Sequence, residues 1–300
     1  MTSTFGNAAL KCYAKFDSPV KPLLGGILSK DHLMNQSKLT STGPLLVAIH
    51  GALMDHTVWQ QCPKLFPASL ATYMPDLVGH GQKHKCENNT EPLLYKALTP
   101  EHLAIDILAE SQQFHQDQLN NRSIIIIGHS LGGLVALSLH QSLGEQGIKT
   151  RAILLGDSPI YPLGDTASQK AARVQLEQTA LGRNLLQNCF DGFEANSKQN
   201  RKSHSIYEEQ IELACKDTSV TFMAGLLGPN HRNGFNDCGT FVSEASRQKL
   251  IKLKSKGLAV QVVEDAGHFV FHSPIGTAFT KVWIENHIKA SSRSTPKIPR

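Results

Sequence analysis

Residues 123–144, SIIIIGHSLGGLVALSLHQSLG, contain the pattern on which the fold prediction rests. The four isoleucines at 124–127 predict a strand that is buried on both faces, and the leucines that follow at helical spacing predict a helix. Between these elements, residues 128–132 match G-x-S-x-G, a motif that needs a strand before it and a helix after it. We therefore expect a sharp turn that presents the hydroxyl of Ser130 as a nucleophile.

Strands and helices alternate on both sides of this stretch. We predict strands at 45–49, from 71, at 122–127, at 151–157, from 219 and from 258, and helices at 57–65, 100–119, 129–144, 244–256 and 277–290. Such alternation predicts the α/β class, with a mostly parallel central sheet that carries helices on both faces.

One long interval interrupts the alternation. Residues 159–215 show helical patterns without a convincing strand, which predicts a helical cap inserted into the core. The core is then formed by 41–158 and 216–288. Residues 1–40 show no clear pattern, and residues 289–300, rich in Ser, Pro and basic residues, are predicted to form a flexible basic tail.

A serine hydroxyl needs a neighbouring base before it can act as a nucleophile. The chain contains 14 histidines. His268 is favoured by its position, because it follows the last predicted strand, at the edge of a parallel sheet where ligand sites form. The resulting chain order of serine, acid and histidine supports this choice. His272 is the fallback.

The third residue should be a carboxylate that orients the imidazole. We favour Asp237, which follows the strand that begins at 219, on strand-end placement alone. Its loop, GPNHRNGFNDCG, is longer than such turns usually are, so Asp157 at the end of an earlier strand remains the alternative acid. Two further aspartates are excluded. Asp217 precedes its strand, and Asp265 is too close to His268 in the sequence.

Two backbone N–H groups are expected to hold the negative charge that develops on a substrate oxygen. One belongs to Leu131, directly after the nucleophile. The other belongs to Ala52, in the segment HGA at 50–52, which ends an early strand.

Composition argues against other classes of protein. The formal net charge is +5, but four of the basic residues lie in 289–300, so the remainder is close to neutral and predicts no nucleic-acid partner. We find no run long enough for a secretory signal or an integral membrane segment, and we expect a cytoplasmic protein. The sequence leaves its oligomeric state open.

Metal binding is also not expected. The six cysteines form no C-x-x-C pair. A few histidines and cysteines cluster loosely, but their spacing fits no standard zinc pattern: His80, His84, Cys86, His231 and Cys238. We therefore predict that the chemistry uses neither a metal nor a cofactor.

These motifs together resemble the α/β-hydrolase superfamily, in its serine-nucleophile, esterase- and lipase-like branch. The resemblance extends from about 44 to 287 and is carried by HGALMDHTVW (50–59), PDLVGHGQ (75–82), GHSLGG (128–133), LLGDSP (154–159) and EDAGHFVFHSP (264–274). It implies a cap after the sixth strand of the family and a triad of Ser130, His268 and an acid after the seventh strand, where Asp237 would fall. The serine at the turn differs from the aspartate that epoxide hydrolases and haloalkane dehalogenases use there.

The leading hypothesis is a serine hydrolase that cleaves a carboxylic ester or thioester of a small-molecule acyl substrate through an acyl-enzyme. A carbon–carbon bond hydrolase or an acyltransferase would use the same triad. A member of the fold that binds a small molecule without hydrolysing it is an alternative from a different functional class.

Overall fold

The computed structural model describes residues 33–34, 43–62, 65–85, 98–120, 122–161, 163, 166–190, 206–228 and 239–289. These residues contain a seven-stranded sheet with the order β1-β3-β2-β4-β5-β6-β7. The strands are β1 (Leu33–Met34), β2 (Leu45–Ile49), β3 (Ala71–Tyr73), β4 (Ile124–His129), β5 (Thr150–Gly156), β6 (Ser219–Gly225) and β7 (Ala259–Val263). β1 pairs antiparallel with β3, and the other pairings are parallel. The predicted α/β class is confirmed.

Strand β4 forms the centre of the sheet. All six of its residues are buried, and Ile126 lies opposite Val47 of β2 on one side and Ile153 of β5 on the other. Apolar side chains on both faces are what a central parallel strand requires, so the isoleucine run accounts for this position. The chain leaves β2 toward β3 on one side and continues through β4 on the other. The C-terminal ends of β2 and β4 therefore border the point where the strand order reverses, which is where α/β sheets bind ligands.

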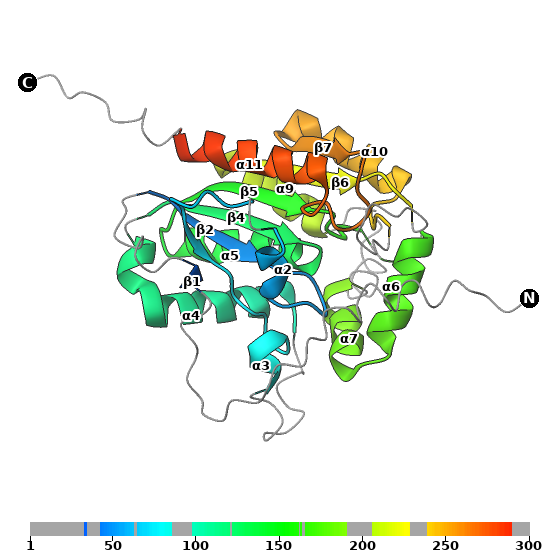
Figure 1. Ribbon diagram of the computed structural model, residues 1–300, viewed down its shortest axis with the longest axis horizontal. Coiled ribbons are helices and arrows are strands. Elements are labelled where there is room, and N and C mark those ends of the chain that lie inside the picture. The colour runs from blue at the N-terminus through cyan, green and yellow to red at the C-terminus, as the bar shows by residue number, and fades with distance from the viewer. Residues whose placement is uncertain are drawn as a thin grey trace, which may run out of the picture.

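Helices cover both faces of the sheet. Helices α4 (Pro100–Asn120), α5 (Leu131–Glu145) and α9 (Ile206–Asp217) form one layer, in which α5 packs against both of the others. Helix α11 (Pro274–Lys289) contacts β6, where the Trp283 indole N–H donates a 3.0 Å hydrogen bond to the Thr221 hydroxyl. Figure 1 shows α11 on one side of the sheet and α4 and α5 on the other.

The shorter helices are α2 (Thr57–Gln60), α3 (Gly81–Lys85) and α10 (Glu244–Lys252), the last continued by the 3₁₀ segment η6 (Leu253–Lys256). The helix expected at 57–65 thus ends early. Pro63 follows Cys62 in the sequence, and a residue before proline is biased away from helical geometry.

The segment predicted to form an inserted cap contains α6 (Ala167–Glu177), α7 (Ala180–Leu185) and the π-helical η5 (Leu186–Phe190). Figure 1 shows α6 and α7 beyond the C-terminal ends of the strands. Helix α9, most of which falls within the predicted cap, packs against α5 and leads directly into β6. We therefore propose that the cap ends before Ile206, not at 215.

The two ends of the chain are covered only in small part. Of the predicted N-terminal segment, residues 33–34 are described, and of the predicted tail, Lys289. Among the helices in the described ranges, none combines the length and the apolar character needed to cross a membrane.

The turn after β4 packs tightly against β2. A Cβ atom added at Gly132, in the first turn of α5, would lie 2.3 Å from the carbonyl oxygen of Ile49 and 2.5 Å from that of His50. Both neighbours are backbone atoms, one in the last residue of β2 and one in the residue after it, so they cannot shift without disturbing the packed core. Glycine at this position therefore allows α5 to begin directly against the end of β2.

We predict that Gly132→Ala lowers the free energy of unfolding by about 2 kcal/mol or more, because it forces α5 away from β2. Gly144→Ala is the matched control in the same helix, since a Cβ there meets nothing within 4 Å. It should raise the free energy of unfolding by about 0.5–1 kcal/mol, the helix propensity difference between the two residues. Urea unfolding of both variants checks the prediction, and equal effects would contradict it.

Candidate active site

Ser130 occupies the turn between β4 and α5. Its backbone has φ 53° and ψ −121°, a left-handed conformation that side chains rarely adopt. The turn is held by two hydrogen bonds of 2.9 Å, from the Ser130 N–H to the Gly156 carbonyl and from the Gly133 N–H to the Ser130 carbonyl. Such strain costs about 1–3 kcal/mol and persists where the surrounding structure enforces it, typically at functional sites.

The end of β2 lies beside this serine. A Cβ atom added at Gly51 would be 3.1 Å from the Cβ of Ser130. Ala52 follows, and the next residue, Leu53, also has a positive φ of 58°. Leu131 is the first residue of α5, where backbone N–H groups lack an acceptor within the helix. The two expected backbone donors, Ala52 and Leu131, therefore belong to segments that flank Ser130.

His50 fixes the turn that carries Ala52. Its Nε2 accepts a 3.0 Å hydrogen bond from the Leu77 N–H, so the proton of the neutral ring is on Nδ1, which donates to the Gly51 carbonyl at 2.8 Å. Burial lowers the pKa of His50 and so favours this neutral form, although the nearby Asp76 acts in the opposite direction and raises the pKa. His50 thus joins the turn after β2 to the segment after β3.

Asp76 organises the segment after β3. Its carboxylate accepts hydrogen bonds from the His56 backbone N–H at 2.8 Å, from the His56 ring Nδ1 at 2.9 Å and from the Gln82 N–H at 2.9 Å. Burial alone would raise the pKa of Asp76, but these donors and the nearby histidines hold it below its ordinary value of 3.8. The D-x-x-G-H-G sequence, through Asp76, therefore stabilises the segment next to the turn after β2.

His268 follows β7 and is paired with Asp157. Its Nδ1 lies 2.8 Å from Asp157 Oδ2, with 1% of the histidine side chain and 0% of the aspartate side chain exposed. Asp157 directly follows β5 and has a positive φ of 44°. Three further donors reach its carboxylate: the Gly225 N–H at 3.1 Å, the Thr240 hydroxyl at 2.7 Å and the Phe241 N–H at 2.7 Å.

Of the acids considered from the sequence, the structure brings Asp157 to His268. The favoured Asp237 lies outside the described residues. Asp217 ends α9 before β6, at the opposite edge of the sheet, and Asp265 accepts a hydrogen bond from the Ile275 N–H in the first turn of α11. The fallback base His272 has its Nε2 3.2 Å from the Val58 carbonyl, so this nitrogen is engaged with the α2 segment.

Three contributors to this site had no signal as site residues in the sequence. His129 donates from Nε2 to the His268 carbonyl at 2.9 Å. Burial, and to a smaller extent the neighbouring His268, lowers the pKa of His129 well below its usual value, so the ring is neutral. Thr240 and Phe241 supply donors to Asp157 from a segment that matches no motif. His129 lies inside G-x-S-x-G, but the motif leaves that position open, so it gave no signal for a role in the site.

Of the loose cluster of histidines and cysteines, only the side chain of His80 lies in the described part of the chain. No group of three or more His, Cys, Asp or Glu residues is arranged to hold a metal there. His80 Nδ1 donates to the Val78 carbonyl at 3.0 Å. The other members of the cluster, or their side chains, lie outside the described residues: His84, Cys86, His231 and Cys238.

The hydrogen bonds of Asp76 predict a pH-dependent stability. Because its folded-state pKa is lowered, the ionised carboxylate stabilises the fold fully above about pH 4, and this contribution is lost as the pH falls toward the folded-state pKa. Asp76→Asn should therefore lower the free energy of unfolding at neutral pH and flatten its decline between about pH 5 and pH 2. Urea unfolding across this range measures both effects. Parallel pH profiles for the variant and the wild type would contradict the prediction.

Comparison with known proteins adds to this geometry. Residues 46–278 match the family model described as the alpha/beta hydrolase family. A curated relative, the pimeloyl-[acyl-carrier protein] methyl ester esterase of Vibrio atlanticus (strain LGP32), is 30% identical over 123 residues. The match covers 41% of this chain and 40% of the relative, so it spans less than half the length of that protein.

Solved structures share the fold at low sequence identity. The thioesterase domain from the curacin biosynthetic pathway aligns with a TM-score of 0.51 and 14% identity, over 81% of this chain and 92% of that domain. A haloalkane dehalogenase loop variant from Bradyrhizobium elkanii aligns with a TM-score of 0.51 and 15% identity, over 85% and 93%. Since these two proteins are named for different reactions, the likeness shows the fold alone. The match over 46–278, the sheet order and the strand-turn-helix around Ser130 together show that this chain belongs to the α/β-hydrolase family.

Proposed function

We propose that this protein is a serine hydrolase that cleaves a carboxylic ester or thioester through an acyl-enzyme. The observation that carries the proposal is the 2.8 Å contact between His268 Nδ1 and Asp157 Oδ2, at the sheet edge where the Ser130 turn lies. A hydrogen bond from Nδ1–H to a carboxylate fixes the tautomer in which Nε2 carries the lone pair that can accept a proton. That is the form of histidine a serine nucleophile needs.

In the proposed reaction, His268 Nε2 takes the proton of the Ser130 hydroxyl as the oxygen attacks the substrate carbonyl. The tetrahedral intermediate collapses, and the alcohol or thiol leaves with the proton that His268 returns. A water molecule then attacks the acyl-enzyme, with His268 again acting as the base. Asp157 stabilises the imidazolium that forms twice in this cycle.

Asp157 takes the place of Asp237 in this proposal. A buried carboxylate that accepts three further hydrogen bonds beside the histidine is fixed in direction, which suits an orienting acid. The assignment puts the acid after the strand that corresponds to the sixth of the family, one strand earlier than the resemblance implies.

The backbone N–H groups of Ala52 and Leu131 are the proposed donors to the oxyanion. They lie just after the ends of β2 and β4, on segments that flank Ser130, and the hydrogen bonds of His50 restrain the first of these segments. Donors that are fixed before the reaction begins stabilise developing charge without a reorganisation cost.

The curated relative supports the choice of an ester, because that protein is named as a methyl ester esterase. Carbon–carbon bond hydrolysis and acyl transfer would use the same residues.

We predict that Asp157→Asn lowers kcat by about 10³- to 10⁴-fold, because an amide no longer holds the imidazole in the productive tautomer. Asp237→Asn is the matched control and should leave kcat near the wild-type value. Melting temperatures of both variants separate lost catalysis from lost folding. If Asp237→Asn abolished turnover and Asp157→Asn did not, the acid would be Asp237.

Ser130→Ala should abolish turnover of p-nitrophenyl acyl esters and labelling by a fluorophosphonate. Wild-type rates on esters of graded acyl length would give the size of the acyl site. A binding protein would instead show no wild-type turnover and no labelling of Ser130. That outcome would replace the hydrolase proposal with a role in ligand binding.

A further inference from the structure

Phe241 lies directly against the ring of His268. The two ring centroids are 3.7 Å apart with an interplanar angle of 20°, a stacked arrangement, and Phe241 is 5% exposed. The backbone N–H of Phe241 also donates to Asp157 Oδ2, the oxygen that His268 Nδ1 contacts. A single residue therefore touches both members of the His–Asp pair, one through its ring and the other through its backbone.

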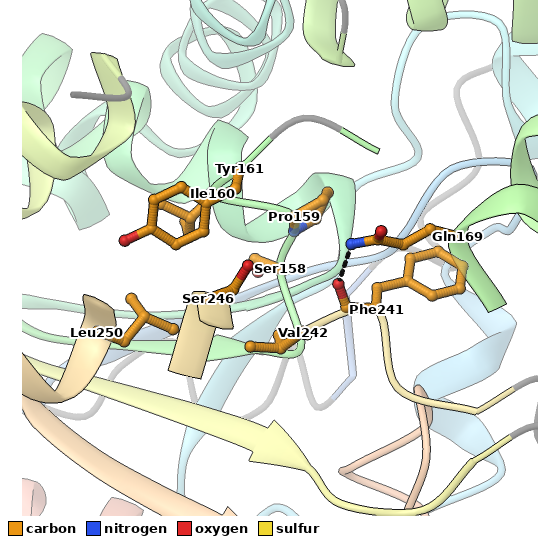
Figure 2. A pocket seen from close by; sticks show the side chains of 9 residues that line it. All are labelled: Ser158, Pro159, Ile160, Tyr161, Gln169, Phe241, Val242, Ser246 and Leu250. Atoms are coloured by element: carbon orange, nitrogen blue, oxygen red, sulfur yellow. Dashed lines mark hydrogen bonds between the residues drawn. The ribbon is translucent and has the colours of Figure 1, made fainter. Parts of the chain in front are cut away.

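Gln169 holds Phe241 from the side of the cap. Its side-chain N–H donates a 2.6 Å hydrogen bond to the Phe241 carbonyl, and its Oε1 accepts from the Thr166 N–H at 3.0 Å as part of the capping box that begins α6. Both ends of the amide are thus engaged, and the residue is 1% exposed. Figure 2 shows the amide directed at the Phe241 carbonyl in a recess that Ser158 and Pro159 also line.

We propose that Phe241 is a positioning residue for His268 and that Gln169 connects this contact to the cap helix α6. The inference rests on the proposed roles of Ser130 and His268. The cap thereby contributes to the chemical step through the Gln169–Phe241–His268 contacts, in addition to any part it has in holding the substrate.

The stacked ring acts when the histidine becomes charged. In the proposed mechanism His268 acts as the base, and it becomes an imidazolium when it takes the proton of Ser130. The face of an aromatic ring attracts a cation within about 6 Å of its centroid. An interaction that strengthens as the charge develops lowers the barrier to reaction without tightening substrate binding, so its loss should appear in kcat and not in KM.

Phe241→Leu removes the ring and keeps the backbone N–H to Asp157. We expect kcat on a p-nitrophenyl ester to fall by about 3- to 30-fold with little change in KM, and Phe241→Tyr to restore it. Phe66→Leu is the matched control, a 9% exposed phenylalanine whose ring contact is with Trp59. Unchanged kcat in Phe241→Leu, or an equal loss in Phe66→Leu, would overturn the inference.

Pentafluorophenylalanine at position 241 separates charge stabilisation from shape. It preserves the ring and its packing but reverses the electrostatic character of the face. We expect kcat to fall at least as far as in Phe241→Leu while the melting temperature stays near that of the wild type. A kcat equal to that of the wild type would overturn the electrostatic role.

Gln169→Glu tests the connection to the cap. A glutamate can still close the capping box with Thr166 but no longer donates to the Phe241 carbonyl. Gln178→Glu, the same chemical change at the exposed C-cap of α6, is the control. We expect the first variant alone to lower kcat, and its effect to vanish when Phe241→Leu is also present, because both act through one contact. Additive losses would overturn the connection.

Failure of this inference is distinguishable from failure of the proposed function. Wild-type turnover that requires Ser130, together with unchanged kcat in the variants at 241, overturns the positioning role alone. Absence of both turnover and fluorophosphonate labelling in the wild type overturns the proposed function on which it rests.

Discussion

The carboxylate of Asp157 is the group on which the arrangement of the site depends. It is fully buried, and a buried charge costs many kcal/mol unless it is paired and hydrogen-bonded. Its partners come from the end of β6, from Thr240 and Phe241, and from His268 after β7. Satisfying this one charge therefore draws three separate parts of the chain to the end of β5 and fixes the segments that follow β6 and β7 relative to each other.

Backbone strain is concentrated at the same edge of the sheet. Three non-glycine residues in the described ranges have positive φ, and all follow the ends of neighbouring strands: Leu53, Ser130 and Asp157. Each costs about 1–3 kcal/mol on its own. The buried strands β2, β4 and β5 offset that cost, since their pairing leaves little freedom to relax. A rigid central sheet is thus the condition for holding Ser130 and Asp157, the proposed nucleophile and acid, in unfavourable backbone conformations.

Local patterns predicted what local physics determines. The isoleucine run identified β4, and the glycines around Ser130 identified the turn, because a buried strand and a tight turn each restrict composition over a few residues. The choice between Asp157 and Asp237 depended on which carboxylate accepts hydrogen bonds from donors far away in the sequence, and a short sequence pattern cannot predict such contacts. Phe241 carries no motif either, since its contact with His268 exists only in the folded chain. The predicted C-terminal boundary of the cap differs from the proposed one for a related reason. The helical pattern of α9 is the same whether this helix packs on α5 or belongs to a cap.

The separation of Asp157 from its supporting residues also determines when the site can form during synthesis. The acid and the donors at 240 and 241 are about 80 residues apart, and the histidine comes later still. Folding on the ribosome proceeds from the N-terminus, so the strand bearing Ser130 is available long before its partners emerge. A nascent or prematurely terminated chain that ends before residue 268 contains the proposed nucleophile Ser130 without the proposed base His268, so the contact between His268 and Asp157 cannot form in it.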